Sequence, residues 1–324
     1  MTKYIAITSI LSPTGAVRKF AALKDFRLII AGDRKTPAVW KCRDAIFLSL
    51  ADQLKLGYRL TRSLPYDHYC RKMTAYIYSA KNGADMIVDT DDDNIPLSGW
   101  SFPVFNGRFQ TTPDDLGFIN IYRSFTKQNI WPRGLPLKFV AAKREPVKTA
   151  GLPARIGVWQ GLADEDPDVD AIYRLTINKP CYFSKHAPIV LGKGTLSPFN
   201  SQNTMFRKEL FPLLYLPAHV TFRFTDILRG LVAQPIMWAA GYRLGFTDAT
   251  VIQKRNPHDY MKDFASEIPC YLNCEEAVNI AMDAVKKTRS VPDNLYSVYR
   301  ALGKNNIVEE RELRLLELWL KDIA

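Results

Sequence analysis

The chain has 324 residues, of which 47% are hydrophobic and 24% are charged, and its lysines and arginines exceed its aspartates and glutamates by 11. This composition excludes a disordered or fibrous protein and predicts one large globular domain or two smaller ones. The positive balance favours an anionic partner, such as a nucleotide diphosphate, a nucleic acid or an acidic membrane surface, although it also serves solubility.

Three features of the sequence indicate the cellular compartment: the amino terminus, the apolar stretches and the cysteines. The first residues, MTKYIAITSI, form no secretory signal pattern and are expected to begin with a strand. The longest apolar stretches, 210–222 and 231–242, are shorter than the ~20 residues that cross a bilayer, so no membrane span is predicted. Five cysteines without paired spacing indicate a reducing compartment, and Cys270 with Cys274 offers too few ligands for a zinc site. We therefore expect a cytoplasmic protein.

Strands and helices alternate along the first part of the chain. Strands are predicted at three β-rich runs and helices at three segments whose apolar positions fit one helical face, namely 4–10, 26–31 and 85–88 for the strands and 13–23, 44–56 and 67–81 for the helices. This alternation predicts an α/β fold with an open, mostly parallel sheet. In such sheets ligands bind just beyond the carboxyl ends of the strands.

The later part of the chain is predicted to be different. The pattern weakens into short strands and turns between 98 and 153. Toward the carboxyl end, apolar spacing predicts three amphipathic helices interrupted at Pro292 and Gly303. We interpret 271–324 as a helical appendage packed on a main domain that spans 1–270.

A cluster of four aspartates follows the third strand, in the stretch GADMIVDTDDDNIP (83–96). Buried carboxylates need a compensating cation, and oxygen ligands favour Mg²⁺, Mn²⁺ or Ca²⁺. An EF-hand calcium loop does not fit, because its sixth and twelfth positions, counted from Asp89, hold Asn94 and Trp100. A phosphatase-type aspartate pair lacks the hydroxyl residue expected at Asp93. An exposed acidic turn and the DxD arrangement of nucleotide-sugar-dependent glycosyltransferases remain.

The wider sequence resembles a known family. ARIGVWQGLADEDPDVDAIYRLT (154–176), SPFNSQNT (197–204), VTFRFTDILRG (220–230) and QKRNPHDY (253–260), together with VDTDDDN, resemble the STELLO glycosyltransferases, in the same order, over residues 4 to about 270. SQNTMFRKEL and the aspartates are more distantly similar to the reversibly glycosylated polypeptides, which include arabinopyranose mutases. The resemblance implies a GT-A fold, a nucleotide-sugar donor and a divalent cation, Mn²⁺ or Mg²⁺.

On this resemblance, the ends of the first two strands bind the nucleotide. Thr8 and Ser9 end the first strand. The turn AGDRKTP after the second strand offers Asp33 to the base or ribose and Arg34 or Lys35 to phosphate. Ordinary turn polarity is the alternative for these residues.

The helix before the aspartates and the aspartates themselves are predicted to hold the diphosphate and the metal. Adjacent helical residues point about 100° apart, so only one of Arg71 and Lys72 is expected to reach the diphosphate, with Arg71 preferred and a solvated face as the alternative. Asp91 and Asp93 face one side of an extended backbone and are predicted metal ligands, with Asp89 closer to the ribose. The cation would bridge the phosphates and stabilise the departing nucleotide.

The remaining catalytic candidates come from the carboxy-terminal half. His258 is the candidate third metal ligand and Arg255 a phosphate clamp, with a surface histidine as the alternative. Asp226 is the candidate general base, in the first turn of a helix N-capped by Thr225, with Arg229 on the same face. A salt bridge at a helix start is the alternative. The base would take the acceptor proton and invert the anomeric configuration, while retention stays open.

Amides and further side chains are candidates for the sugar. Asn200, Gln202 and Asn203 suit hydroxyl groups, because each amide both donates and accepts hydrogen bonds. Of the alternating aspartates at 164–170, Asp170 is the one expected to touch the sugar. Trp159 is predicted to stack on a sugar ring or to pack in the core.

The leading hypothesis is a cytoplasmic, metal-dependent glycosyltransferase in cell-surface polysaccharide synthesis. Its acceptor would be a saccharide or a lipid-linked saccharide, and its tail helices could contact an anionic membrane peripherally. The alternatives are a nucleotide-sugar mutase or self-glycosylating protein and a non-catalytic scaffold with a transferase fold. Nucleic acid is not an expected partner, because the basic residues are dispersed and no recognition motif is visible.

Overall fold

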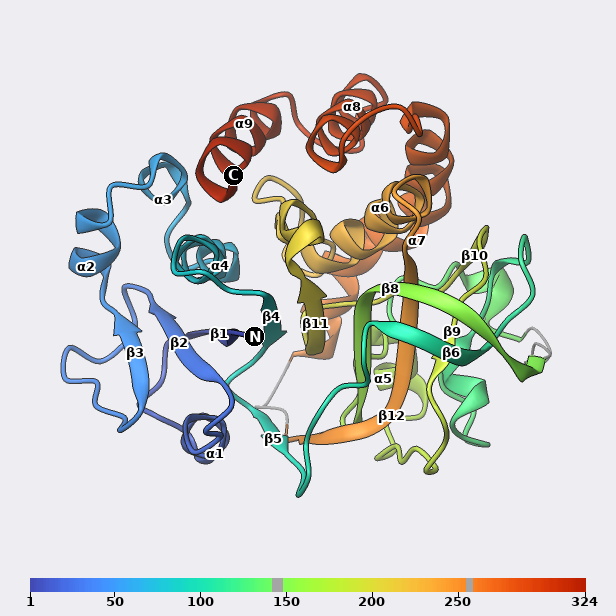
Figure 1. Ribbon diagram of the computed structural model, residues 1–324, viewed down its shortest axis with the longest axis horizontal. Helices are drawn as coiled ribbons and strands as arrows, with labels where there is room; N and C mark the ends of the chain where they lie inside the picture. Colours follow the sequence, from blue (N-terminus) through green and yellow to red (C-terminus); the bar gives the residue numbers. More distant parts are fainter. Residues whose placement is uncertain (142–147, 255–258) are drawn as a thin grey trace.

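The computed structural model describes residues 1–141, 148–254 and 259–324. Within these residues, ten strands form one mixed sheet in the order β3-β2-β1-β4-β11-β8-β6-β9-β12-β5 (Figure 1). Its first part is parallel and consists of β1 (Lys3–Ser9), β2 (Arg27–Gly32), β3 (Ala45–Leu48) and β4 (Met86–Thr90). The carboxyl ends of these strands therefore lie at one edge of the sheet, as predicted.

The second part of the sheet is joined to the first through β11 (Asn203–Arg207), which runs antiparallel to β4 and to β8 (Lys148–Glu165). The long β8 also pairs with β6 and β12, and β12 pairs with β5, which follows β4 in the chain. The other strands of this part are β5 (Asn94–Pro96), β6 (Asn106–Thr111), β9 (Ile189–Val190) and β12 (Arg243–Gln253). A separate two-stranded sheet is formed by β7 (Gly117–Phe118) and β10 (Thr195–Leu196).

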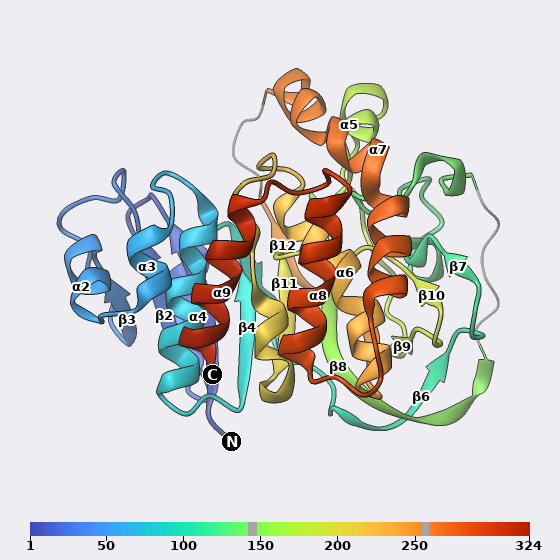
Figure 2. The ribbon, with the colours of Figure 1, turned by 90° about the horizontal axis from the view of Figure 1, so that it is seen from above.

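Helices cover both faces of the sheet. Alternate residues of β1 point to opposite faces, so Tyr4 joins the larger buried cluster and Ile5 the smaller one. The α-helices are α1 (Gly15–Ala21), α2 (Leu50–Lys55), α3 (Arg59–Ser63), α4 (Lys72–Lys81), α5 (Ala171–Thr176), α6 (Thr225–Ala239), α7 (Tyr260–Ala284), α8 (Val291–Lys304) and α9 (Arg311–Ile323). Short 3₁₀ helices lie at η1 (Tyr69–Arg71), η2 (Ile121–Ser124), η3 (Leu137–Phe139) and η4 (Lys208–Leu214). Figure 2 shows α4, α9, α8 and α7 side by side on one face.

This arrangement confirms the predicted α/β fold, with one local correction. The segment 44–56 is not a single helix, because Ala45–Leu48 is strand β3 and only Leu50–Lys55 is helical, with Ser49 as its N-cap. The apolar residues AIFL fit either structure on their own, and pairing with β2 selects the strand.

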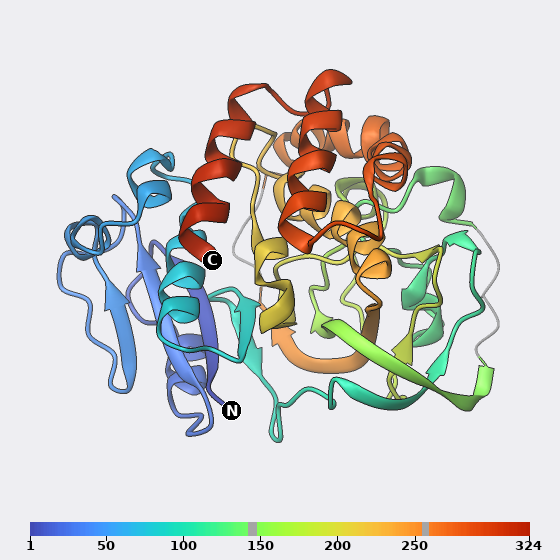
Figure 3. The same cartoon turned by 45° about the horizontal axis from the view of Figure 1, so that its top comes forward.

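The three predicted carboxy-terminal helices are present as α7, α8 and α9 (Figure 3). Pro292 lies in the first turn of α8, where a missing N–H costs nothing, and Gly303 lies near its end. The predicted boundary between 270 and 271 falls inside α7, and side chains from all three helices belong to the larger cluster of the sheet. Among the described helices, none combines the length and apolar character needed to cross a membrane.

Candidate active site

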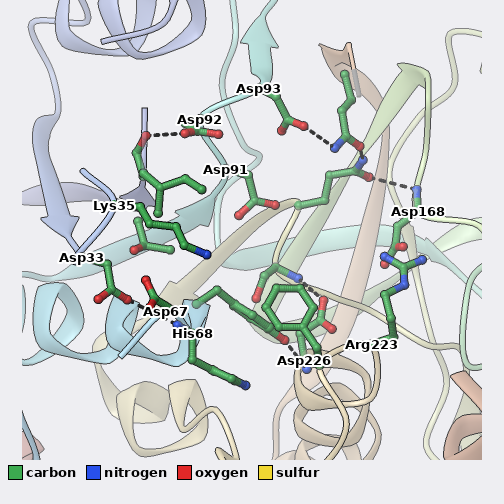
Figure 4. Close-up of a pocket in the computed structure, with 18 of the residues that line it drawn as sticks. Asp33, Lys35, Asp67, His68, Asp91, Asp92, Asp93, Asp168, Arg223 and Asp226 are labelled. Atoms are coloured by element: carbon green, nitrogen blue, oxygen red, sulfur yellow. Dashed lines mark hydrogen bonds between the residues drawn. The ribbon is translucent and has the colours of Figure 1, made fainter. Parts of the chain in front are cut away.

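A cavity of about 420 Å³ lies where β1, β2 and β4 end and α6 begins. Its size is ordinary for a small-molecule site. Figure 4 shows Asp33 and Lys35 on one side of the cavity, with Asp168 and Arg223 opposite. Charged side chains dominate its lining, which contains seven aspartates and three basic residues: Asp33, Asp67, Asp91, Asp92, Asp93, Asp168 and Asp226, with Lys35, Arg133 and Arg223.

A buried lysine supports the predicted DxD segment from behind. The Lys72 ammonium lies 2.9 Å from Asp89 Oδ1 and 2.7 Å from Asp91 Oδ1, and it also donates to the Thr90 carbonyl. Arg229 contacts the other Asp89 oxygen, Oδ2, at 2.6 Å. Burial disfavours every one of these charges. The two aspartates nevertheless raise the pKa of Lys72, and Lys72 with Arg229 lowers the pKa of Asp89.

The turn after β4 presents three carboxylates to the cavity. Burial and the neighbouring Asp93 raise the pKa of Asp91, although Lys72 opposes this shift. Asp92 accepts a short hydrogen bond from the Ser9 hydroxyl. Asp93 Oδ2 accepts from Gln253 Nε2 at 3.1 Å, whereas Asp93 Oδ1 is buried and has no hydrogen-bond partner among the described residues.

These carboxylates fit a cation that completes its coordination with other oxygens. Within the described ranges, no group of three or more histidine, cysteine, aspartate or glutamate side chains is placed to hold a metal ion. Mg²⁺ and its analogues typically take one or two protein carboxylates and fill the remaining positions with phosphate oxygens and water. The unpartnered oxygen of Asp93 and the exposed part of Asp91 meet that requirement.

Opposite the DxD turn, Arg133 joins two carboxylates. Its guanidinium binds Asp168 through Nε and Nη2, both at 2.8 Å, and its Nη2 lies 3.1 Å and 3.2 Å from the oxygens of Asp226. The Ser201 backbone N–H donates to Asp226 Oδ2, and the Asp226 backbone N–H donates to the Tyr69 hydroxyl oxygen. Asp226 is therefore fixed at the cavity wall by groups that are distant in sequence.

Asp226 lies in the first turn of α6 as predicted, but the capping prediction is wrong. The helix begins at Thr225 with Phe224 as its N-cap, and no side chain caps it. Arg229 does not line the cavity or pair with Asp226, because it points to Asp89 and to the Asn200 carbonyl.

The nucleotide candidates divide between the cavity and its surroundings. Thr8, Ser9, Asp33 and Lys35 line the cavity, and Asp33 accepts a hydrogen bond from the backbone N–H of the adjacent Arg34. The Arg34 guanidinium lies outside the lining, over the Tyr66 ring at 4.0 Å.

Of the predicted pair Arg71 and Lys72, Lys72 is the one that reaches the aspartates. Arg71 is buried against Gln53, to which it donates at 2.6 Å, and it does not line the cavity. The preference for Arg71 therefore differs from the observed geometry, because the Arg71 guanidinium donates to Gln53 and to the Leu64 carbonyl instead.

The three amide candidates for the sugar lie in different places. Gln202 lines the cavity, while Asn200 supports it by donating to Asp168 Oδ2 at 2.8 Å. Asn203 lies outside the lining and donates to Thr250 at 2.7 Å.

Two further candidates are structural. Trp159 is fully buried in the core. Asp170 caps α5 and accepts a hydrogen bond from Trp131. Among the alternating aspartates, Asp168 is the one that lines the cavity. Arg255 and His258 lie outside the described residues.

Sequence reasoning missed several lining residues, including Arg133, Asp168, His68, Tyr69 and Phe222. Arg133 had a usable signal, since it interrupts the otherwise uncharged stretch IWPRGLP, where an arginine requires a buried partner. The aromatic residues gave none, because aromatic side chains are common in any core.

Comparisons with known proteins agree with the resemblance found in the sequence segments quoted above. The family model of the STELLO glycosyltransferases matches residues 223–324. The chain is 25% identical over 343 aligned residues to probable glycosyltransferase STELLO1 of Arabidopsis thaliana and 26% identical over 341 to probable glycosyltransferase STELLO2 of the same plant. Both alignments cover 99% of this chain and 44% of the relative, so the chain spans less than half the length of these relatives. The predicted resemblance is confirmed, and along nearly its whole length the chain is similar to these probable glycosyltransferases.

Proposed function

We propose that the chain is a metal-dependent glycosyltransferase of the GT-A kind. It transfers a sugar from a nucleotide-diphosphate donor to a hydroxyl of a saccharide or lipid-linked saccharide. The similarity to probable glycosyltransferases supports the reaction class, and the position of the cavity at the carboxyl ends of parallel strands supports a nucleotide site.

The observation that carries the proposal is the charge of the cavity. Seven aspartates and three basic residues line it, in a chain whose overall balance is +11. A diphosphate would be repelled by such a lining unless a cation entered with it. The carboxylates therefore suit a donor that binds together with Mn²⁺ or Mg²⁺ and suit a free anion poorly.

Asp91 and Asp93 are the proposed metal ligands. A bound divalent ion would stabilise the negative charge that develops on the departing nucleotide diphosphate. Lys72 and Arg229 act behind these ligands as positioning residues, because they neutralise Asp89 and hold Asp91 in place.

Asp226 is the proposed general base. Asp168 is less suited, since Arg133 grips both of its oxygens at 2.8 Å and Asn200 donates to it as well. Asp226 makes longer contacts with the same guanidinium. It takes the acceptor proton while the acceptor oxygen attacks the anomeric carbon from the side opposite the leaving group, which inverts the configuration.

The wider setting is proposed on the charge of the chain. A net balance of +11 suits a cytoplasmic enzyme of cell-surface polysaccharide synthesis that meets its acceptor at an anionic membrane. Sedimentation of the full chain with anionic vesicles tests this contact, and no binding at low ionic strength would remove it.

The first test of the reaction is calorimetric titration of the full chain with UDP, GDP, CDP and dTDP, with and without Mn²⁺. We expect metal-dependent binding of one nucleotide, weakened at least tenfold by Asp91→Ala with Asp93→Ala. Asp283→Ala, an exposed aspartate on α7, is the matched control and should bind normally.

A sugar derivative of the nucleotide that binds in this titration then tests Asp226 as the general base. Asp226→Asn should keep nucleotide binding within threefold and lose transfer by about 100-fold or more, the usual contribution of general base catalysis. A chain that binds no nucleotide under any metal condition would contradict the proposed function.

A further inference from the structure

Three aromatic residues form a continuous surface inside the otherwise acidic cavity. His68 and Tyr69 stack nearly parallel, with centroids 5.5 Å apart and an interplanar angle of 10°. Phe222 meets both rings edge-on, at 5.4 Å and 4.7 Å. All three line the cavity, and we call them the aromatic shelf.

Phe222 is held in place although it is exposed. Its side chain is 52% exposed, while the residues on either side are tied to α7. Thr221 donates to the Ser266 carbonyl at 2.7 Å, and Arg223 binds the fully buried Glu267 at 2.8 Å. An apolar ring that is fixed in place and left open to solvent is preorganised to bind a ligand surface.

The shelf lies beside the proposed base. The Asp226 backbone N–H donates to the Tyr69 hydroxyl at 2.8 Å, and Phe222 precedes Asp226 by four residues. Figure 4 shows Asp226 on the far side of the cavity from Asp92 and Asp93. The His68 end of the shelf adjoins Asp33, because the His68 backbone N–H donates to Asp33 Oδ2 at 3.3 Å. A donor with its phosphates at the DxD turn and its base at Asp33 leaves the Phe222 end of the shelf to the second substrate.

We propose that the aromatic shelf is the binding subsite for a sugar ring of the acceptor, with Phe222 as its specificity-determining residue. The proposal rests on the proposed function and assigns the acceptor a binding surface. A pyranose offers an apolar face of C–H groups, which suits an aromatic surface, and a rim of hydroxyls. Those hydroxyls would donate to the carboxylates of Asp226 and Asp67 nearby.

The experiment uses saturation-transfer NMR of the full chain with methyl glycosides of glucose, galactose, mannose and xylose. Each is measured with Mn²⁺, alone and with the nucleotide that binds in the titration. Phe222→Leu keeps an apolar side chain but removes the ring, and Phe222→Trp keeps a ring. Tyr182→Leu is the matched control, because Tyr182 is 56% exposed and does not line the cavity.

We expect at least one glycoside to receive saturation at its ring C–H protons. The signal should fall at least fivefold in Phe222→Leu and persist in Phe222→Trp and Tyr182→Leu. Nucleotide affinity should stay within twofold in all three variants.

Two results would overturn the proposal while leaving the proposed function intact. One is nucleotide binding without any glycoside signal, or with a signal that Phe222→Leu leaves unchanged. The other is a tenfold loss of nucleotide affinity in Phe222→Leu, which would assign the shelf to the nucleobase. Absence of nucleotide binding by the wild-type chain would instead contradict the proposed function itself.

Discussion

At the scale of single residues, the site depends on a buried lysine that compensates two aspartates, one fully buried and one partly exposed. Lys72 is fully buried and pairs with Asp89 and Asp91. Removing one partner of a buried ion pair leaves an uncompensated charge, which typically costs about 3–5 kcal/mol. Asp89 keeps Arg229 in such a variant, but Asp91 loses its cation.

We predict that Lys72→Met lowers the free energy of unfolding by about 3 kcal/mol, measured by urea denaturation near pH 7. Lys55→Met is the control, because Lys55 forms an exposed pair with Asp52. The control should change stability by no more than about 0.5 kcal/mol. Equal stabilities for the two variants would show that Lys72 is not the required counter-ion.

At the scale of elements, the short helix α5 is closed at its start by a buried capping residue. Asp170 caps the six-residue α5 by accepting from the Tyr173 N–H at 2.9 Å, and it also accepts from Trp131 at 2.6 Å. Burial outweighs these bonds and raises the pKa of Asp170 to about 6. An unfolded aspartate has a pKa of about 3.9.

This difference predicts a pH dependence of stability. Between pH ~4 and ~6 the folded state binds more protons at Asp170 than the unfolded state does, so the free energy of unfolding falls as the pH rises. The stabilisation is complete below the unfolded pKa and is lost as the pH passes the folded pKa, with a size of about 3 kcal/mol.

Asp170→Asn retains a good capping residue but does not titrate. The stability of the wild type relative to this variant should therefore decrease from pH 4 to pH 7, as followed by urea unfolding at several pH values. Asp293→Asn, at the exposed start of α8, provides the comparison. A wild-type advantage that grows with pH would contradict the burial argument.

At the scale of the whole molecule, the carboxy-terminal helices are built into the sheet domain. Trp319 of α9 is fully buried, packs edge-on against Tyr76 of α4 and donates to the Pro212 carbonyl at 2.9 Å. Glu312 accepts from the Tyr215 hydroxyl, and Asp322 accepts from the Leu60 N–H. These contacts predict one cooperative unit, in place of a main domain with an independent appendage.

We predict that Trp319→Ala lowers the free energy of unfolding of the entire chain by about 3–5 kcal/mol, the usual cost of deleting a buried tryptophan. Far-UV circular dichroism and nucleotide binding should report the same single transition. Leu272→Ala, at a residue 72% exposed on α7, should have little effect. Two separate transitions would instead support an independent unit at 271–324.

The sequence by itself determined three strands of the parallel part of the sheet, several helices and the location of the acidic turn at the end of a strand. These features follow from local periodicity and from aspartates that are adjacent in the chain. The resemblance to the STELLO glycosyltransferases added an expected reaction class. Only the tertiary structure decided the state of 45–48, where pairing with a neighbouring strand overrode a helical pattern. It also decided that Lys72 and not Arg71 meets the DxD segment, and that Arg133 meets Asp226 from 93 residues away. Such partners depend on how distant elements pack, and local patterns carry no information about that packing.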